Sequence, residues 1–200
     1  MSKHHFSAKS ASICGHVEMT SFAYGSKSTR MSDQLYAANT ICMACSSKLG
    51  ALVAPEEKGF FKLQLPSLIG TVRTIPYANC LRIKRLRAIG PVMARLDKSD
   101  EPLAKVALAV YQLLFKVTEA AFWITTKDLP FDRFWMAFEV AALMRRGVTS
   151  SVRTSASSVH EYWRIRDSSV LATAAESLGA LHIETALPPQ ETAIANEAVA

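Results

Sequence analysis

The sequence predicts a mainly α-helical protein, with a three-helix bundle in its C-terminal part, a small mixed α/β N-terminal part and flexible ends. Two observations lead to this fold class. Apolar residues recur at helical spacing through residues 100–180, whereas alternation typical of a strand is confined to short stretches before residue 76. Half of the residues are apolar and a fifth are charged, so the chain can form a hydrophobic core.

The first 32 residues are rich in Ser, Thr, Lys and Gly and have no sustained hydrophobic period. This composition predicts a flexible N-terminal arm over residues 1–32. Residues 33–99 then form a basic segment of mixed α/β character. At the other end, the small residues and the glutamates after Pro188-Pro189 predict a disordered acidic tail over residues 181–200.

Within residues 33–99 the sequence predicts a helix, two strands and a second helix. The first helix begins near Asp33 and ends at Gly50. Residues 60–65 alternate between apolar and polar side chains, which predicts a strand ended by Pro66, and residues 68–75 predict another. The basic run that follows fits either period. We favour a helix that Gly90-Pro91 would end.

The C-terminal half carries the clearest helical signals. A long apolar face runs from Leu103 to Ile124, with Asp100 as its expected N-cap. A second helix is expected to start at Asp128 and to end at Arg145-Arg146-Gly147. Ser158 and Glu161 form a capping box for a third helix that reaches Gly179. These three helices make residues 100–180 the predicted helical bundle core.

The charge of the chain is unevenly distributed. Residues 58–96 carry eight Lys or Arg and no Asp or Glu, whereas no Lys or Arg follows Arg166. Because a solvated surface normally mixes both signs, the central segment predicts a polyanionic partner. We expect phosphates to be contacted by two groups of cations. These are Arg82, Lys84, Arg85 and Arg87 in the central segment, and Arg145, Arg146 and Arg153 later in the chain.

Three kinds of anionic partner could bind this positively charged segment. Nucleic acid, single-stranded in the first instance and either DNA or RNA, is the partner that we favour. An anionic membrane surface is the alternative, since apolar residues interrupt the cations between Arg82 and Arg87. Salt bridges to another subunit are the third. No transmembrane segment is expected, because the most apolar stretch, Val106–Phe115, is far shorter than the roughly 20 residues needed.

The chain has four cysteines: Cys14, Cys42, Cys45 and Cys80. Its first thirty residues contain no apolar segment typical of a secretory signal, which predicts an intracellular protein with reduced thiols. The favoured interpretation is therefore cysteines without a metal. The alternative is a structural zinc ion bound by Cys14, His16, Cys42 and Cys45, which together supply a full set of four ligands.

A short resemblance suggests a catalytic alternative. His16-Val17-Glu18 and the later Cys42-Met43-Ala44-Cys45 resemble the H-x-E and P-C-x-x-C motifs of zinc-dependent nucleobase and nucleoside deaminases, over about thirty residues. The resemblance implies that His16, Cys42 and Cys45 bind zinc and that Glu18 moves protons. No Walker-type phosphate loop or G-x-G-x-x-G motif is present, so nucleotide hydrolysis and dinucleotide binding have no support.

From the sequence we therefore predict a non-enzymatic, self-associating structural protein that binds nucleic-acid phosphates through its basic central segment. A folded core with polar extensions at both ends is the layout of a capsid, nucleocapsid or matrix-like subunit, in the cytoplasm, the nucleus or a virion. The zinc-dependent deaminase and the peripheral membrane protein are the two alternatives.

Overall fold

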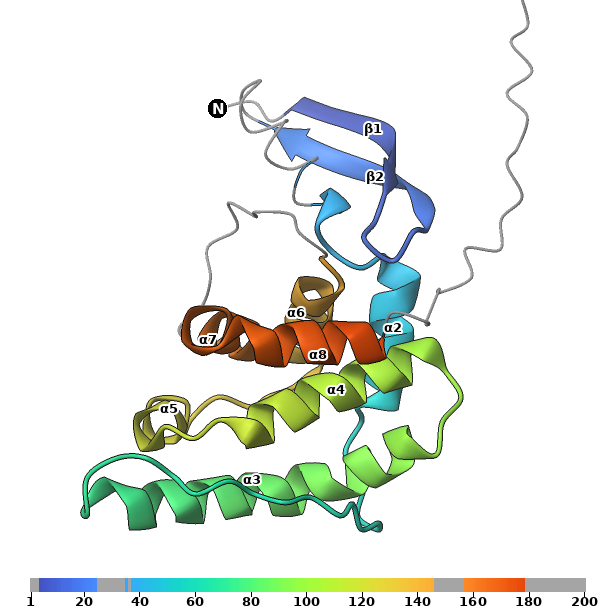
Figure 1. The fold of residues 1–200 in the computed structure, drawn as a ribbon. Helices are drawn as coiled ribbons and strands as arrows, with labels where there is room; N and C mark the ends of the chain where they lie inside the picture. The colour runs from blue at the N-terminus through green and yellow to red at the C-terminus, as the bar shows by residue number, and fades with distance from the viewer. Residues whose placement is uncertain (1–3, 25–34, 36, 146–156, 179–200) are drawn as a thin grey trace, which may run out of the picture.

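A computed structural model of the protein describes residues 4–24, 35, 37–145 and 157–178. The predicted fold class is confirmed, because these residues are mainly helical and carry a small sheet at the N-terminal end (Figure 1). The elements are β1 (His4–Ala11), β2 (Val17–Tyr24), α2 (Met43–Leu52), α3 (Thr74–Asp97), α4 (Pro102–Lys116), α5 (Ala120–Thr125), α6 (Arg133–Met144), α7 (Val159–Arg166) and α8 (Ser168–Ser177).

Helix α4 lies at the centre of the fold. It contacts α2, α3, α6 and α7, and ten of its fifteen residues are buried. Helices α3 and α5 pack together on one side of it, and the β-hairpin lies at the opposite end of the molecule (Figure 1). None of the described helices combines the length and the apolar character that crossing a bilayer requires.

The N-terminal segment, which we expected to be a flexible arm, contains the only sheet of the described residues. Strands β1 and β2 pair antiparallel, from His4 opposite Tyr24 to Ala11 opposite Val17. Between them Gly15 adopts a φ of 83°, a left-handed conformation that glycine accepts without strain. Small residues such as Ser7 and Ala8 fill these strands, so no hydrophobic alternation marked them in the sequence.

The two strands predicted within residues 60–75 are wrong. Residues 60–68 have no regular secondary structure, and a single parallel bridge joins Ile69 to Glu119. The segment runs alongside α3, where Gly59 packs so closely that a Cβ would lie 3.1 Å from that of Ala94. The stretch therefore covers a helix instead of joining a sheet.

Both helices predicted for residues 33–99 have different limits. Helix α2 starts at Met43, with Cys42 as its N-cap, and extends past the expected end at Gly50. Helix α3 continues through Pro91 to Asp97. A proline in a helix costs a hydrogen bond, but Met93 and Leu96 beyond it are completely buried, and this burial favours continuation.

The predicted long helix from Leu103 to Ile124 is divided into α4 and α5. The break falls at Val117–Glu119, where the Ile69 N–H donates to the Thr118 carbonyl at 2.7 Å and the Ala120 N–H donates to the Ile69 carbonyl at 2.9 Å. Helix α4 begins at Pro102 with Glu101 in the N-cap position that we expected of Asp100. A contact with a distant segment therefore overrides the local helical pattern.

The second and third predicted helices are also shifted or divided. Helix α6 starts after Asp132, whose carboxylate accepts from the Phe134 and Trp135 N–H groups, and not at Asp128. The Ser158 cap is confirmed, because its hydroxyl accepts from the Glu161 N–H at 3.1 Å. That helix ends at Arg166, short of the expected Gly179, and Asp167 caps the start of α8. Gly147, Gly179 and the predicted acidic tail lie outside the described residues.

Candidate metal centre and cationic helix face

Four potential metal ligands meet where the hairpin joins the helical body. Cys14 and His16 lie in the turn between β1 and β2, and Cys42 and Cys45 lie at the start of α2. Their ligand atoms are all within 4.8 Å of one another. The structure thus brings together the four residues of the zinc alternative, from two segments that are more than 25 residues apart.

The two distances from His16 to the cysteines of α2 match a tetrahedral zinc site. His16 Nδ1 lies 3.5 Å from Cys42 Sγ and 3.3 Å from Cys45 Sγ. Zn–S and Zn–N bonds of about 2.3 and 2.0–2.1 Å place sulfur and nitrogen ligands roughly 3.5 Å apart in a tetrahedron. The contacts of His16 with Cys42 and Cys45 would therefore need little change to hold a zinc ion.

Backbone hydrogen bonds hold the sulfur atoms in place. The Cys42 N–H donates to Cys14 Sγ at 3.3 Å, and the Cys45 N–H donates to Cys42 Sγ at 3.3 Å. The Ile13 N–H also donates to the Thr40 carbonyl at 2.9 Å, which ties the turn to the start of α2. Such donors stabilise thiolates and orient them, as outer-shell groups do around bound metals.

The three sulfur atoms are buried, and this affects their ionisation. Burial raises the pKa of Cys42 and of Cys45, and the neighbouring cysteines raise that of Cys45 further. Burial opposes the ionisation of Cys14 as well, but hydrogen bonds from the backbone and the side chains of Cys42 and His16 together outweigh it and lower its pKa. A divalent cation would remove the repulsion between these sulfurs and deprotonate them.

The position of Cys14 distinguishes a structural centre from a catalytic one. The deaminase resemblance needs three protein ligands and a water, with Glu18 as the proton carrier. Glu18 does lie at the cluster, since it contributes to the raised pKa of Cys42. Cys14, however, supplies a fourth protein ligand, which is typical of a closed structural site.

The central cationic group is only partly available. Arg82 is buried, and it donates to the Pro66 carbonyl at 2.7 Å and to Asn79 Oδ1 at 3.0 Å. Its burial lowers its pKa. Arg85 donates to the Lys127 carbonyl at 2.6 Å and lies over the Phe131 ring. These two guanidinium groups hold α3 against its neighbours. Two of the four cations predicted to contact phosphates in the central segment are therefore bound within the protein itself.

Lys84 and Arg87 remain exposed, and they belong to a longer stripe on α3. Arg73, Tyr77, Cys80, Lys84 and Arg87 follow one another at intervals of three or four residues and are all exposed. We call this stripe the α3 face; it spans about 21 Å. Arg73 and Tyr77 were not among the predicted site residues, although helical spacing continued backwards from Lys84 reaches both.

The second cationic group does not join this face. Arg145 is half-buried at the end of α6, and its Nε donates to the Asn39 carbonyl at 3.2 Å. It lines a cavity of about 390 Å³ between the start of α2 and α6, together with Met43 and Phe134. Arg146 and Arg153 lie outside the described residues.

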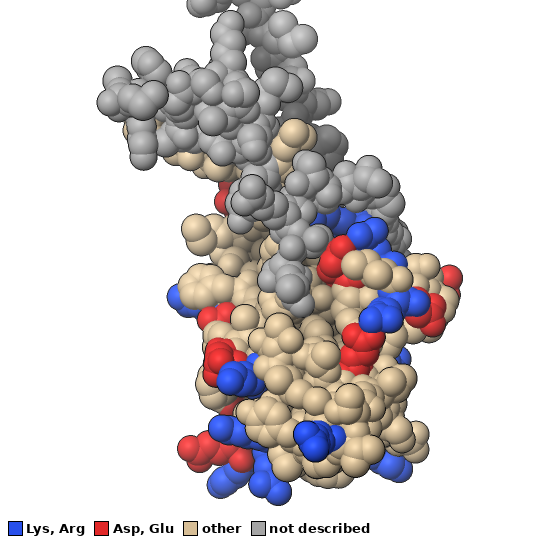
Figure 2. All heavy atoms as spheres, turned by 90° about the vertical axis from the view of Figure 1, so that its left-hand side faces the viewer, with Lys and Arg blue, Asp and Glu red and all other residues tan. Residues whose placement is uncertain are grey.

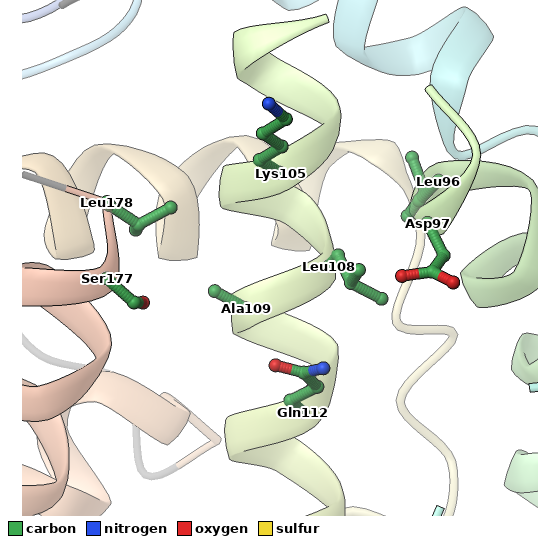
Figure 3. A pocket seen from close by; sticks show the side chains of 8 residues that line it. All are labelled: Leu96, Asp97, Lys105, Leu108, Ala109, Gln112, Ser177 and Leu178. Carbon is green, nitrogen blue, oxygen red and sulfur yellow. The ribbon is translucent and has the colours of Figure 1, made fainter. Parts of the chain in front are cut away.

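A larger cavity, of about 440 Å³, lies between the end of α3, α4 and α8 (Figure 3). Its lining mixes aliphatic side chains such as Leu108 with Asp97 and Lys105, which carry opposite charges. None of the sequence-predicted site residues lines it. The cavity is therefore separate from both the metal cluster and the α3 face.

Helix α6 contains a buried carboxylate that the sequence did not predict. Glu139 in α6 is 1% exposed, and its Oε2 accepts from the His160 N–H at 2.9 Å, at the start of α7. Its Oε1 has no hydrogen-bond partner. Burial raises the pKa of Glu139 to about 7. Its position among apolar residues of α6 was the only signal in the sequence.

Comparison with known proteins adds no relative, since no family model, curated protein or solved structure matches the chain.

Proposed function

We propose that this protein is a non-enzymatic structural protein that binds one zinc ion through Cys14, His16, Cys42 and Cys45. The observation that carries this proposal is the convergence of four ligand atoms within 4.8 Å. The zinc ion would join the hairpin to the start of α2. Its role is therefore to build the N-terminal part of the fold, and the fourth ligand, Cys14, favours this role over deaminase chemistry at Glu18.

Metal analysis of the purified chain tests the proposal. We expect one zinc per chain in the wild type and a loss of most of it in Cys42→Ser and Cys45→Ser, because serine hydroxyls are poor zinc ligands. Cys80→Ser is the matched control, since Cys80 is an exposed free cysteine on α3. Zinc at the wild-type level in both cluster variants would refute the assignment.

A second candidate function is the binding of phosphates by the α3 face. Arg73, Lys84 and Arg87 are exposed along one side of the helix, and no Asp or Glu occurs between Lys58 and Leu96. A row of cations of this kind neutralises successive phosphates and releases counterions. Nucleic acid, the partner favoured by the sequence, is one source of such phosphates. Self-association and a capsid or matrix-like role remain predictions from the layout of the sequence.

The salt dependence of oligonucleotide binding tests this candidate. For a single strand, each phosphate that a cation no longer neutralises should reduce the slope of log K against log salt by about 0.7. The double variant Lys84→Gln/Arg87→Gln is therefore expected to reduce the slope by about 1.4. Lys105→Gln, an exposed cation on α4, is the control and should leave the slope unchanged. A slope equal to the wild type in the double variant would exclude the α3 face.

A further inference from the structure

Two large apolar side chains are held in solvent at the end of the molecule where α3 begins. Ile69 is 67% exposed and Val72 is 90% exposed, both in the turn that precedes the helix. Tyr77, in the first turns of α3, is half exposed. Figure 2 views this end and shows a largely uncharged surface in its lower half, with one Lys or Arg within it and with Lys and Arg, beside an acidic group, at the lower edge.

The turn that carries these side chains is fixed to the core. The Ile69 backbone makes both hydrogen bonds to the junction of α4 and α5, and the Thr71 N–H donates to Thr74 Oγ1 at 2.9 Å. Gly70 packs so closely there that a Cβ would lie 2.8 Å from that of Ala120. The backbone is thus anchored while the neighbouring side chains point outward, so folding does not bury them. This arrangement suits a surface that meets an apolar partner.

The cations of the α3 face begin at this end and run away from it along the helix. Arg73 directly follows Val72, and Lys84 and Arg87 continue along the helix with no acidic residue before Asp97. Exposed aliphatic side chains beside cations, with a tyrosine between them, match the interface of an anionic bilayer. Phosphates of a nucleic acid would pair with the cations but would leave Ile69 and Val72 in water.

We propose that this end of the protein docks on an anionic membrane surface, with Ile69 and Val72 in the headgroup region and the α3 face against lipid phosphates. The inference rests on the phosphate-binding function proposed above and names its partner. Membrane association of this kind needs no helix that spans the bilayer.

Co-sedimentation with vesicles tests the inference. The full chain is expected to bind vesicles of phosphatidylcholine and phosphatidylserine, and to bind phosphatidylcholine alone far more weakly. Ile69→Ser/Val72→Ser should weaken binding at least about tenfold, since it removes the inserted apolar area. Arg73→Gln/Arg87→Gln should weaken it about fivefold for each charge.

Two controls match these variants. Phe134→Ser removes an equally exposed apolar side chain from α6, and Lys105→Gln removes a cation from α4, so both should bind vesicles as the wild type does. Equal vesicle binding by Ile69→Ser/Val72→Ser and the wild type would overturn the inference. Binding to an oligonucleotide but not to vesicles would overturn it and leave the phosphate-binding function in place. Binding to neither would overturn both.

Discussion

Removal of zinc is expected to unfold residues 4–24 and the first turn of α2 while the helices from α3 onward stay folded. The two-stranded hairpin has no extensive contact with any described helix, and hairpins of this size are marginal by themselves. Zinc binding contributes about 10–16 kcal/mol to the folding of small zinc modules. Without the ion, three buried sulfurs and one imidazole would have to hold the hairpin.

Amide hydrogen exchange with and without a chelator would measure this effect. We expect protection to be lost in β1 and β2 and retained in α4, most of which is buried. Cys45→Ser should reproduce the effect of the chelator, and Cys80→Ser should not. Full protection of the hairpin in a sample shown to be free of metal would contradict the prediction.

Ionisation of Glu139 is expected to destabilise the fold at neutral and higher pH. Burial raises its pKa from 4.5 to about 7, so the native state binds more protons than the unfolded state between these values. Stability therefore falls as the pH rises through this window and then levels off, by about 3 kcal/mol in total. Glu139→Gln keeps an acceptor for the His160 N–H and should lose this dependence.

Urea unfolding of both proteins between about pH 5 and 8 measures the difference. Burial lowers the pKa of His160 from 6.5, so its protonation destabilises the fold as the pH falls. His160 is present in both proteins, so the difference in stability between Glu139→Gln and the wild type at each pH removes the contribution of His160. Glu161→Gln is the control: Arg164 lowers the pKa of Glu161, so its stabilisation is lost only below that range. A constant difference between Glu139→Gln and the wild type would contradict the assignment.

The sequence predicted the helical core well because its signals are local. The Ser158 cap and the apolar face from Leu103 onward are decided by neighbours along the chain, and both are confirmed. The points at which helices divide or end could not be predicted from local signals. The division at Thr118 depends on backbone bonds from Ile69, and the end of α3 depends on the burial of Leu96.

The same contrast between local signals and distant contacts applies to the candidate sites. The cysteine pair at Cys42 and Cys45 was visible as a spacing, but its meeting with His16 depends on a hairpin whose small residues carry no hydrophobic signal. The sequence showed where the cations are, but it did not show which of their side chains face solvent. Arg82 and Lys84 are two positions apart, so the helix places them on different sides, one buried and one exposed.

Helix α2 has contacts that fix it at both ends. Its first turn carries Cys42 and Cys45, and at its other end Arg95 donates to the Leu52 and Ala54 carbonyls, at 2.9 and 2.5 Å, and pairs with Glu56. A helix of ten residues is a spacer of about 15 Å. The turn that carries Cys14 and His16 is thereby kept a set distance from α3, so the two ends of the molecule cannot approach each other without unwinding α2.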